Sequence, residues 1–360
     1  MKILHIIDHL GQGGARTIVE SLIKNNNNQM VLSLRKKINE PILDNQTSKR
    51  VFIYPSNSKY NLGCLNFTKN LLKKNKDISI LHCHDIKSYI VGYLMNKIYF
   101  KDKKLIFHEH GRIFTNKILY NYFLNKSQKD VDYFIAVSKV TSDKLVENAN
   151  INKNKIRVLY NFINSFRQQK YLKLNFKKNI KRFEIKKDQF VIGFMGRLNK
   201  IKGCDVLIKS LPLINSKYKL IISGDGPEMK NLKVLSKNLK VDKNVLFIGY
   251  YNKPEEIYGI LDVLIVPSRS ESFGLSAVEG QSMGIPIIGS NLEGLRDSLG
   301  ESGYIRFEKD NHIQLAEKIN YLIKNKIIKN KLIKKGLERS KLYSYDNFIK
   351  NLDNLYGSFK

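Results

Sequence analysis

The chain has 360 residues, of which 42% are apolar and 26% charged, and its formal net charge is +31. This length favours two domains over a single core, and the apolar fraction excludes an intrinsically disordered chain. No apolar run approaches the roughly 18 residues of a membrane-spanning helix, and the three scattered cysteines lack metal-ligand spacing.

Strand-like and helix-like patterns alternate along the first half of the chain. We expect strands at 2–7, 30–34, 78–82, 104–108, 133–137 and 156–159, with helices near 15–24, near 65–74 and from about residue 139. Alternation of this kind is typical of a parallel, doubly wound sheet with helices between its strands.

The second half repeats this logic. We expect strands at 190–194, 218–223, 245–248, 263–266 and 286–289. The predicted fold class is therefore α/β, with two Rossmann-like domains that each contain a parallel doubly wound sheet and that face a cleft. We place the first domain at 1–165, a basic linker at 166–187 and the second domain at 188–344.

Three glycine-rich turns follow predicted strands, at 11–16, 196–203 and 224–228. A tight strand-to-helix connection explains each turn taken singly. All three, however, would lie at carboxyl ends of strands, where open α/β sheets bind ligands. In the second turn Arg197 and Lys202 stand five residues apart, and a guanidinium fork with an ammonium could clamp a pyrophosphate.

The segment 267–286 carries the most functional information. It places Glu271 and Glu279 eight residues apart, across the junction between a loop and a helix that starts near Gly274. A helix start offers unpaired backbone N–H groups and the positive end of a dipole to an anion such as a diphosphate. The two carboxylates can accept hydrogen bonds from sugar hydroxyls.

The excess of basic residues has two readings. Most lysines are simply solvated, but the summed field attracts polyanions such as lipid headgroups, sugar nucleotides or nucleic acid. Basic residues concentrate at 167–187 and 324–341. The first of these segments is either a solvated connector or, with its interleaved aromatic and leucine residues, a contact to an anionic membrane surface. No base-stacking or groove-reading motif is present, so nucleic acid is not an expected partner.

Histidines cluster at 81–85 and 107–111, and one Asp-x-Asp pair stands at 130–132. Zinc is disfavoured, because neither histidine pair is joined to a further Cys or His at the spacing of a metal site. The Asp-x-Asp pair precedes a strand and reads as a solvated lead-in. We expect no metal and no other cofactor.

These motifs together resemble the large group of retaining glycosyltransferases of the GT-B fold, glycosyltransferase family 4-like, that includes bacterial polysaccharide and lipopolysaccharide assembly enzymes. The resemblance rests on the N-terminal Gly-Gly and on the segments 136–138, 156–161, 196–203, 223–227 and 271–279. It covers nearly the whole chain. It implies an enzyme that moves a hexose-type sugar from a nucleoside-diphosphate donor, held by the second domain, to an acceptor held by the first.

The resemblance also implies roles for individual residues. Arg197 and Lys202 would bind the donor diphosphate and help the leaving group depart, and Glu279 would bind the ribose hydroxyls. Glu271, a catalytic candidate, would bind the donor sugar together with the backbone of Phe273, Gly274 and Leu275. The remaining donor-side candidates are Gly13, Gly14 and Gly224.

In the first domain, His110 occupies the position where related enzymes place a histidine near the reacting sugar, and it is the catalytic candidate there. The acceptor-side candidates are Arg16, His84 and Asp85. Helix 345–360 is expected to pack back on the first domain, as in such enzymes.

We therefore expect a metal-independent retaining glycosyltransferase of cell-surface polysaccharide or lipopolysaccharide biosynthesis. The donor would be a UDP-sugar or, second, a GDP-sugar, and the acceptor a glycan or lipid-linked glycan. The chain opens with a strand pattern rather than a signal peptide, so we expect a cytoplasmic protein, peripheral on the membrane if its basic surface binds lipid. The alternatives are a sugar-nucleotide epimerase of the same architecture and a basic nucleic-acid-binding or membrane-binding protein without catalysis.

Overall fold

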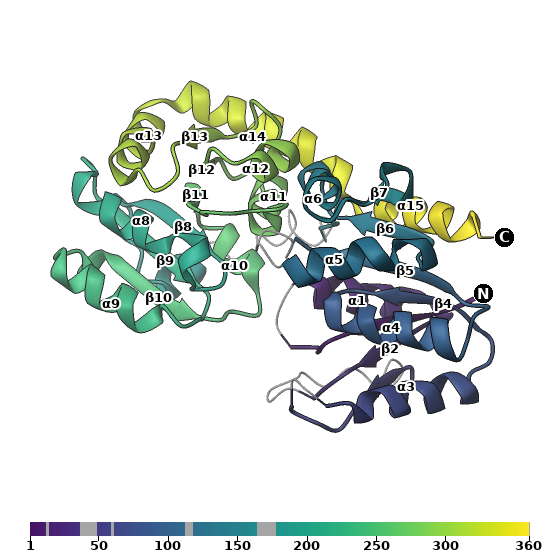
Figure 1. Ribbon diagram of the computed structural model, residues 1–360. Coiled ribbons are helices and arrows are strands. Elements are labelled where there is room, and N and C mark those ends of the chain that lie inside the picture. The colour runs from purple at the N-terminus through teal and green to yellow at the C-terminus, as the bar shows by residue number, and fades with distance from the viewer. Residues whose placement is uncertain (12–13, 37–48, 59–60, 112–117, 164–177, 360) are drawn as a thin grey trace. The chain divides into compact units, whose positions relative to one another are not determined.

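The structure is a computed structural model that describes residues 1–11, 14–36, 49–58, 61–111, 118–163 and 178–359 (Figure 1). It divides into two compact units, Met1–Asn161 with Asn351–Lys360, and Phe162–Lys350. The sequence prediction placed the first boundary at residue 165, with a separate linker behind it. Within the described residues, no helix combines the length and apolar character that crossing a bilayer requires.

The first unit is built on a seven-stranded sheet of order β3-β2-β1-β4-β5-β6-β7, and every pairing in it is parallel. Its strands are β1 (Lys2–Ile7), β2 (Gln29–Ser33), β3 (Val51–Ile53), β4 (Ile78–Cys83), β5 (Lys104–Glu109), β6 (Tyr133–Ala136) and β7 (Ile156–Val158). Its helices are α1 (Gly14–Asn25), α3 (Gly63–Lys74), α4 (Ile86–Ile98), α5 (Ile118–Ser127) and α6 (Lys139–Ala149), with short 3₁₀ turns η1 (Gln128–Asp130) and η2 (Lys153–Lys155).

The two faces of this sheet differ in chemistry. Alternate residues of a strand point to opposite faces. Leu4 of β1, Leu81 of β4 and Phe107 of β5 are fully buried in one apolar cluster with residues of α3, α4 and α6. The intervening residues include His5, His82 and His108, and the same alternation continues to His84 and His110, which directly follow β4 and β5.

The second unit is built on a six-stranded parallel sheet of order β10-β9-β8-β11-β12-β13. Its strands are β8 (Phe190–Met195), β9 (Tyr218–Ser223), β10 (Val245–Gly249), β11 (Val263–Val266), β12 (Ile287–Ser290) and β13 (Ile305–Phe307). Its helices are α8 (Cys204–Ser210), α9 (Met229–Asn238), α10 (Pro254–Tyr258), α11 (Leu275–Ser282), α12 (Glu293–Leu299), α13 (His312–Lys324) and α14 (Lys326–Ser340). Its 3₁₀ turns are η4 (Lys200–Lys202), η5 (Leu211–Leu213), η6 (Asp242–Asn244) and η7 (Lys341–Tyr343).

Part of the predicted linker belongs to this second unit. Residues 164–177 lie outside the described residues, but Phe183 and Ile185 are buried in a cluster with Ile257 of α10 and Ile221 of β9. Residues 178–187 are therefore packed into the second unit and are not a separate solvated connector. These residues pack there because burying each of the two large apolar side chains stabilises the fold by about 1.5–3 kcal/mol.

The last helix, α15 (Tyr345–Gly357), is divided between the two units. At its start, Phe348 packs its ring on Phe162 in the second unit, with centroids 4.8 Å apart. From Asn351 onward the chain belongs to the first unit, where the Tyr356 hydroxyl lies 2.7 Å from His82 Nδ1. This one helix therefore contributes to both cores.

Candidate functional site

In both sheets the strand order reverses beside the first strand, between β1 and β4 in the first unit and between β8 and β11 in the second. The carboxyl ends of parallel strands at such a reversal diverge and leave a crevice for ligands. The predicted site residues follow these strands or a neighbouring one. Each unit therefore carries its own candidate subsite, and the two are described separately.

In the second unit the structure brings Lys202 and Glu271 into direct contact. The ammonium of Lys202, at the end of η4, lies 2.5 Å from Glu271 Oε2, and the hydroxyl of Ser268 lies 3.3 Å from the same oxygen. Lys202 follows β8 and Glu271 follows β11, so the pair forms at the strand reversal. Both side chains keep some exposure, 31% and 12% respectively. A ligand can therefore reach them.

The backbone around Lys202 is fixed by its neighbours in sequence. The side chain of Asn199 caps η4 by accepting a hydrogen bond from the Lys202 N–H at 3.1 Å. Gly203 then adopts φ +64°, and a Cβ at this position would lie 1.9 Å from the carbonyl oxygen of Pro267. Only glycine permits this close approach between the lysine turn and the end of β11.

Arg269 connects the turn η4, which carries Lys202, to the loop that carries Glu271. Its backbone N–H donates to the carbonyl of Ile201 at 2.7 Å, and its guanidinium donates to the carbonyl of Lys200 at 2.5 Å. The same guanidinium makes a bidentate pair with Asp205, at 2.9 and 2.8 Å, and donates to Asp310 at 2.6 Å. Bidentate pairs of this kind hold geometry as well as charge. The sequence prediction did not include Arg269.

The other predicted cation, Arg197, is exposed one residue after the turn at Gly196. That turn lies against the turn at Gly224, where φ is +147° and a Cβ would come within 1.8 Å of the Gly196 carbonyl oxygen. The backbone of Leu198 also donates to Asp225 at 2.9 Å. Arg197 and Gly224 therefore belong to two interlocked turns at the carboxyl ends of β8 and β9.

Gly274 is the N-cap residue of α11, which begins at Leu275, so the helix starts where the sequence indicates. The side chain of Phe273 is buried and meets Tyr343 edge to face at 5.1 Å. It therefore anchors the loop in the core and leaves the backbone as the part that can face a ligand. The first N–H groups of α11 have no partner within the helix, as in any helix.

Glu279 lies on α11, half-buried. Its Oε2 accepts a hydrogen bond from the hydroxyl of Tyr258 at 2.8 Å, and that hydroxyl also lies 3.1 Å from the carbonyl of Ser276. Burial raises the pKa of Glu279 to about 7, because desolvation disfavours the charged carboxylate more than the Tyr258 hydrogen bond favours it. This carboxylate therefore changes its charge near neutral pH.

In the first unit the predicted candidates Arg16, His84, Asp85 and His110 all line one cavity of about 200 Å³. Its other lining residues are Ile7, Asp8, His9, Gly11, Ala15, Ile86, Glu109, Tyr120 and Asn161. Arg16 pairs with Glu20 at 2.7 Å, one helical turn further along α1. Of the two N-terminal glycines predicted for the donor side, Gly14 begins α1 and Gly13 lies outside the described residues.

Asp85 has a structural role in this cavity wall. It is the N-cap of α4, its side chain accepts from the backbone N–H groups of Lys87 and Ser88, and it also accepts from Asp8 N at 2.6 Å. Asp8 in turn receives a bidentate pair from Arg35, at 2.9 and 2.8 Å, and the ammonium of Lys87 at 3.3 Å. These partners lower the pKa of Asp8 despite its partial burial, so the carboxylate stays charged.

The sequence analysis named none of the other polar residues that line this cavity: Asp8, His9, Glu109, Tyr120 and Asn161. Glu109 is buried and accepts a hydrogen bond from the Tyr120 hydroxyl at 2.7 Å, and Asn161 is buried with no hydrogen-bond partner for its Oδ1 among the described residues. Such oxygens recognise hydroxyl donors. Glu109 stands between two noted histidines, which was a usable signal, but nothing in the sequence brings Tyr120 or Asn161 to the same cavity.

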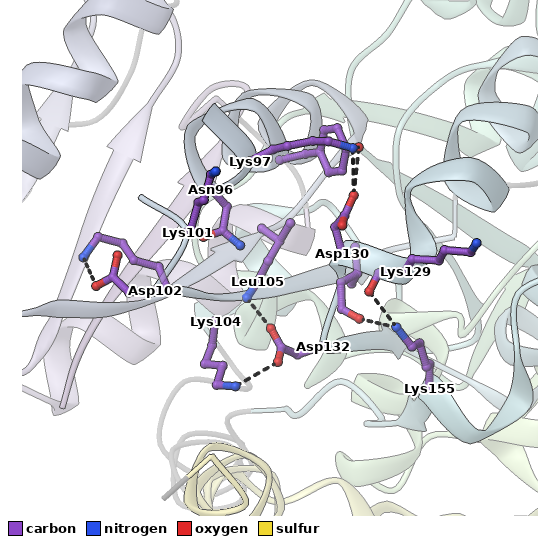
Figure 2. Close-up of a pocket in the computed structure, with 13 residues that line it drawn as sticks. Asn96, Lys97, Lys101, Asp102, Lys104, Leu105, Lys129, Asp130, Asp132 and Lys155 are labelled. Carbon is purple, nitrogen blue, oxygen red and sulfur yellow. Dashed lines mark hydrogen bonds and ion pairs between the residues drawn. The ribbon is translucent and has the colours of Figure 1, made fainter. Parts of the chain in front are cut away.

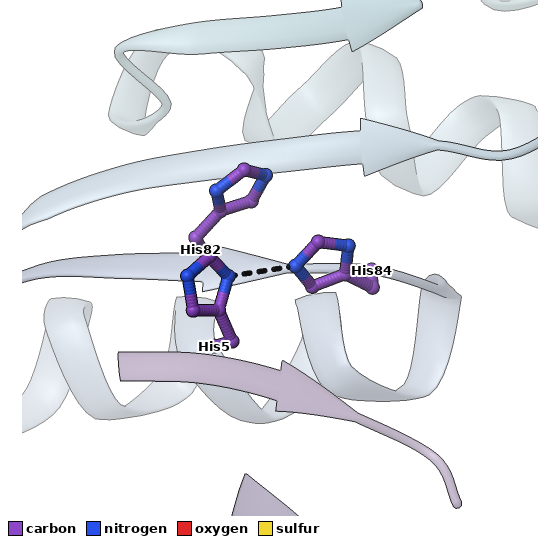
Figure 3. A group of neighbouring side chains, drawn as sticks. All are labelled: His5, His82 and His84. Atoms are coloured by element: carbon purple, nitrogen blue, oxygen red, sulfur yellow. Dashed lines mark hydrogen bonds between the residues drawn. The ribbon is translucent and has the colours of Figure 1, made fainter. Parts of the chain in front are cut away.

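Five of the seven histidines gather on one face of the first sheet, and Figure 3 shows three of them, His5, His82 and His84. One ring nitrogen from each of His5, His82 and His84 lies within 4.8 Å of the other two, and the same holds for His84, His108 and His110. The spacing argument against zinc therefore does not hold, because pairing of β1, β4 and β5 joins histidines that are distant in sequence. The cluster has the residues of a candidate metal centre, and each buried ring is also hydrogen-bonded.

A separate cavity of about 710 Å³ lies at the opposite edge of the first sheet, near the amino ends of β5 and β6 (Figure 2). Two of its lysines face acidic partners: Lys97 pairs with Asp130 at 3.1 Å and Lys104 with Asp132 at 3.3 Å. The Asp-x-Asp pair is therefore engaged in ion pairs at the start of β6.

Comparisons with known proteins agree with this architecture. Residues 14–167 match the family described as Glycosyltransferase Family 4, and residues 175–339 match Glycosyl transferases group 1. The O-antigen biosynthesis glycosyltransferase WclY of Escherichia coli is 28% identical, with 86% of this chain and 89% of the relative covered. The capsular polysaccharide biosynthesis glycosyltransferase CapM of Staphylococcus aureus is 31% identical over 62% of this chain and 61% of its own.

Among solved structures, HepE of Anabaena in complex with UDP-glucose superposes with a TM-score of 0.87 at 16% identity, covering 99% of this chain and all of HepE. At this identity the likeness establishes the fold. The two family matches leave few residues outside them. The chain therefore belongs to the glycosyltransferases of the GT-B fold, with a family 4 first half and a group 1 second half.

Proposed function

We propose that this glycosyltransferase moves a sugar from a UDP-sugar, or second a GDP-sugar, to a glycan or lipid-linked acceptor during assembly of a cell-surface polysaccharide. The transfer retains the anomeric configuration and requires no metal ion. The relatives named for O-antigen and capsular polysaccharide biosynthesis support the pathway class, and the UDP-glucose complex of HepE supports the nucleotide.

The contact between Lys202 and Glu271 carries this proposal. It unites a cation for the diphosphate and a carboxylate for the sugar at the reversal of the second sheet. The start of α11 follows Glu271 by four residues and adds backbone N–H groups. Before a donor binds, each charge neutralises the other. When the donor binds, the diphosphate forms an ion pair with Lys202, and the sugar hydroxyls donate hydrogen bonds to the carboxylate of Glu271.

The chemistry follows from charge. Breaking the glycosyl–phosphate bond leaves positive charge at the anomeric carbon and negative charge on the departing diphosphate. Groups already aimed at that developing charge lower the barrier most, because they need no reorganisation. Lys202, Arg197 and the N-terminus of α11 stabilise the diphosphate in this account, and Glu279 holds the ribose.

The first unit binds the acceptor. The cavity beside His84 and His110 is lined by carboxylates and amide oxygens, which accept hydrogen bonds from hydroxyl groups. The acceptor hydroxyl attacks from the face that the diphosphate leaves, and the diphosphate takes its proton. His110 holds the reacting sugar in this account.

The proposal is tested by incubating the enzyme with UDP- and GDP-sugars and a lipid-linked glycan, and by following the product by NMR. We expect a new glycosidic bond with the anomeric configuration of the donor, unchanged by EDTA. An inverted linkage would contradict the retaining mechanism, and activity lost to EDTA and restored by a divalent metal would contradict metal independence. A changed nucleotide sugar formed without acceptor would indicate an epimerase.

A peripheral membrane location is a separate part of the proposal and rests on the net charge of +31. Sedimentation with vesicles of anionic lipid tests it. Binding that is lost in high salt and absent with neutral vesicles supports an electrostatic contact. No binding to anionic vesicles at low salt would rule it out.

A further inference from the structure

A chain of hydrogen bonds runs through three of the clustered histidines. The side-chain oxygen of Gln29, on β2, lies 3.0 Å from His5 Nε2, and His5 Nδ1 lies 2.9 Å from His84 Nε2. His84 Nδ1 then lies 3.0 Å from His110 Nε2. The dashed line in Figure 3 marks its central bond, between His5 and His84.

This chain has a direction because its inner members are neutral. His5 and His84 are fully buried, and desolvation lowers the pKa of His5 to about 4 and that of His84 well below its usual value. A neutral imidazole has one N–H and one lone pair, so each ring must donate at one nitrogen and accept at the other. The Gln29 oxygen can only accept.

Starting from that oxygen, the protons follow in order. His5 donates from Nε2 to Gln29, so its Nδ1 is the acceptor for His84. His84 therefore donates from Nε2, and its Nδ1 is the acceptor for His110. His110 must then carry a proton on Nε2, and in the neutral form of this ring the lone pair is on Nδ1.

We propose that Gln29, acting through His5 and His84, is a positioning residue that fixes the tautomer of His110. His110 lines the 200 Å³ cavity, whereas Gln29 does not and is separated from His110 by the two rings of His5 and His84. A neutral His110 held in this tautomer can accept a hydrogen bond at Nδ1 from a sugar hydroxyl. The inference deepens the proposed function and rests on it, because that function places His110 at the reacting sugar.

A second chain in the same cluster provides a matched control. The Tyr356 hydroxyl lies 2.7 Å from His82 Nδ1, and His82 Nε2 lies 3.3 Å from His108 Nδ1. Tyr356 is buried as Gln29 is, at 3% and 1% exposure. Tyr356→Phe therefore removes one buried polar group from the same cluster without touching the chain that ends at His110.

The test combines histidine ¹⁵N NMR with kinetics on Gln29→Leu, Gln29→Glu and Tyr356→Phe, the His110 signals being assigned with His110→Asn. In the wild type we expect His110 protonated at Nε2. Gln29→Leu should give mixed His110 tautomers and lower kcat about tenfold with KM within twofold, the size of one lost hydrogen bond. Gln29→Glu keeps the accepting oxygen and should keep the tautomer and most of the activity. Tyr356→Phe should leave the His110 signals unchanged.

Several results would overturn the inference. Wild-type His110 protonated at Nδ1, or an unchanged His110 tautomer in Gln29→Leu, would show that Gln29 does not set it, and mixed tautomers with an unchanged kcat would remove the positioning role. Stoichiometric zinc in the purified protein, bound through these rings, would make the cluster a metal centre instead. The NMR measurement needs no substrate, so it stands even if no UDP- or GDP-sugar is a donor.

Discussion

Glu279 lies in an environment that disfavours its charge, although the charged carboxylate is the form that would accept hydrogen bonds from a ligand. Its partner Tyr258 is itself buried, and its hydroxyl is shared with the carbonyl of Ser276. Desolvation prevails over this single hydrogen bond, so the pKa of Glu279 lies at about 7 rather than near 4.5. The unligated site therefore holds a mixture of charged and neutral Glu279 at neutral pH.

Donor affinity should consequently depend on pH. In the proposed function, two ribose hydroxyls donate hydrogen bonds to Glu279. The ionised carboxylate can accept both, and this form prevails above pH 7 and is lost as the pH falls. We expect the affinity for the donor nucleotide sugar to fall below pH 7, by up to about tenfold per pH unit. Calorimetric titration between pH 5.5 and 8.5 measures this, and the Glu279→Gln variant, which cannot titrate, should show a flat and weaker profile. An equally steep profile in that variant would assign the effect to another group.

Gly203 is a second residue whose role is set by geometry. Gly249 offers the matched comparison, because it also has a positive φ, +70°, but a Cβ there would meet nothing within 4 Å. Gly249→Ala should cost about 1–2 kcal/mol of unfolding free energy, the penalty of the left-handed backbone alone. Gly203→Ala should cost about 2–5 kcal/mol, because the Pro267 carbonyl must also move. Urea unfolding of both variants measures the difference, and equal losses would contradict the close approach.

At the scale of elements, the position of η4 relative to the β11–α11 loop decides whether Lys202 and Glu271 meet. Arg269 joins the two through its backbone and its guanidinium. We expect Arg269→Gln to weaken nucleotide-sugar binding roughly tenfold by misplacing Lys202. The control is Arg306→Gln, which removes an exposed pair with Glu301 in the same unit. If both variants bind the donor as tightly as the wild type does, the contacts of Arg269 are not needed to position η4, and the expectation is wrong.

The elements themselves were largely readable from the sequence. Strands with long apolar runs, such as β1 and β9, were predicted with their observed bounds, and the start of α11 was located by Gly274. The edge strands β3 and β13 were missed, because three residues show no clear period. Helix α4 was missed as well, although Asp85 and Ser88 form its capping box.

The candidate site was only partly readable for a different reason. Motifs located residues that follow strands, such as Lys202 and Glu271, but not the contacts that depend on strand order. The order β1-β4-β5 brings His5 beside His82, and no local pattern encodes it. Arg269 lies in segment 267–286 but was not predicted as a site residue. Its partners Asp205 and Asp310 lie 64 and 41 residues away in sequence, so no local pattern indicates them.

For the whole molecule, the buried histidines predict sensitivity to acid. Burial lowers the pKa of His5 to about 4 and those of His82, His84 and His108 well below 6.5. The unfolded chain takes up these protons as the pH falls through 6.5, whereas the folded chain does not. Stability is therefore complete above pH 6.5 and falls below it, by roughly 1.4 kcal/mol per pH unit for each histidine.

Urea unfolding at pH 7.5, 6.5 and 5.5 checks this expectation. The free energy of unfolding should fall by about 1–2 kcal/mol between the first two values and by several kcal/mol more at the third. The variant His312→Asn, which changes a histidine of α13 outside the cluster, should show the same drop. A free energy that is flat down to pH 5.5 would mean that these histidines take up protons in the folded protein as readily as in the unfolded chain.

The most direct test of the donor site is calorimetric titration of UDP- and GDP-sugars into the wild type, Lys202→Ala and Lys209→Ala. Lys209 is the matched control, because it is an exposed lysine of the adjoining helix α8 that faces Asp205. We predict that one nucleotide sugar binds, that Lys202→Ala weakens its binding about 10- to 100-fold through the loss of a charged hydrogen bond, and that Lys209→Ala changes the affinity less than twofold. Wild-type affinity in Lys202→Ala, or equal weakening in both variants, would contradict this prediction.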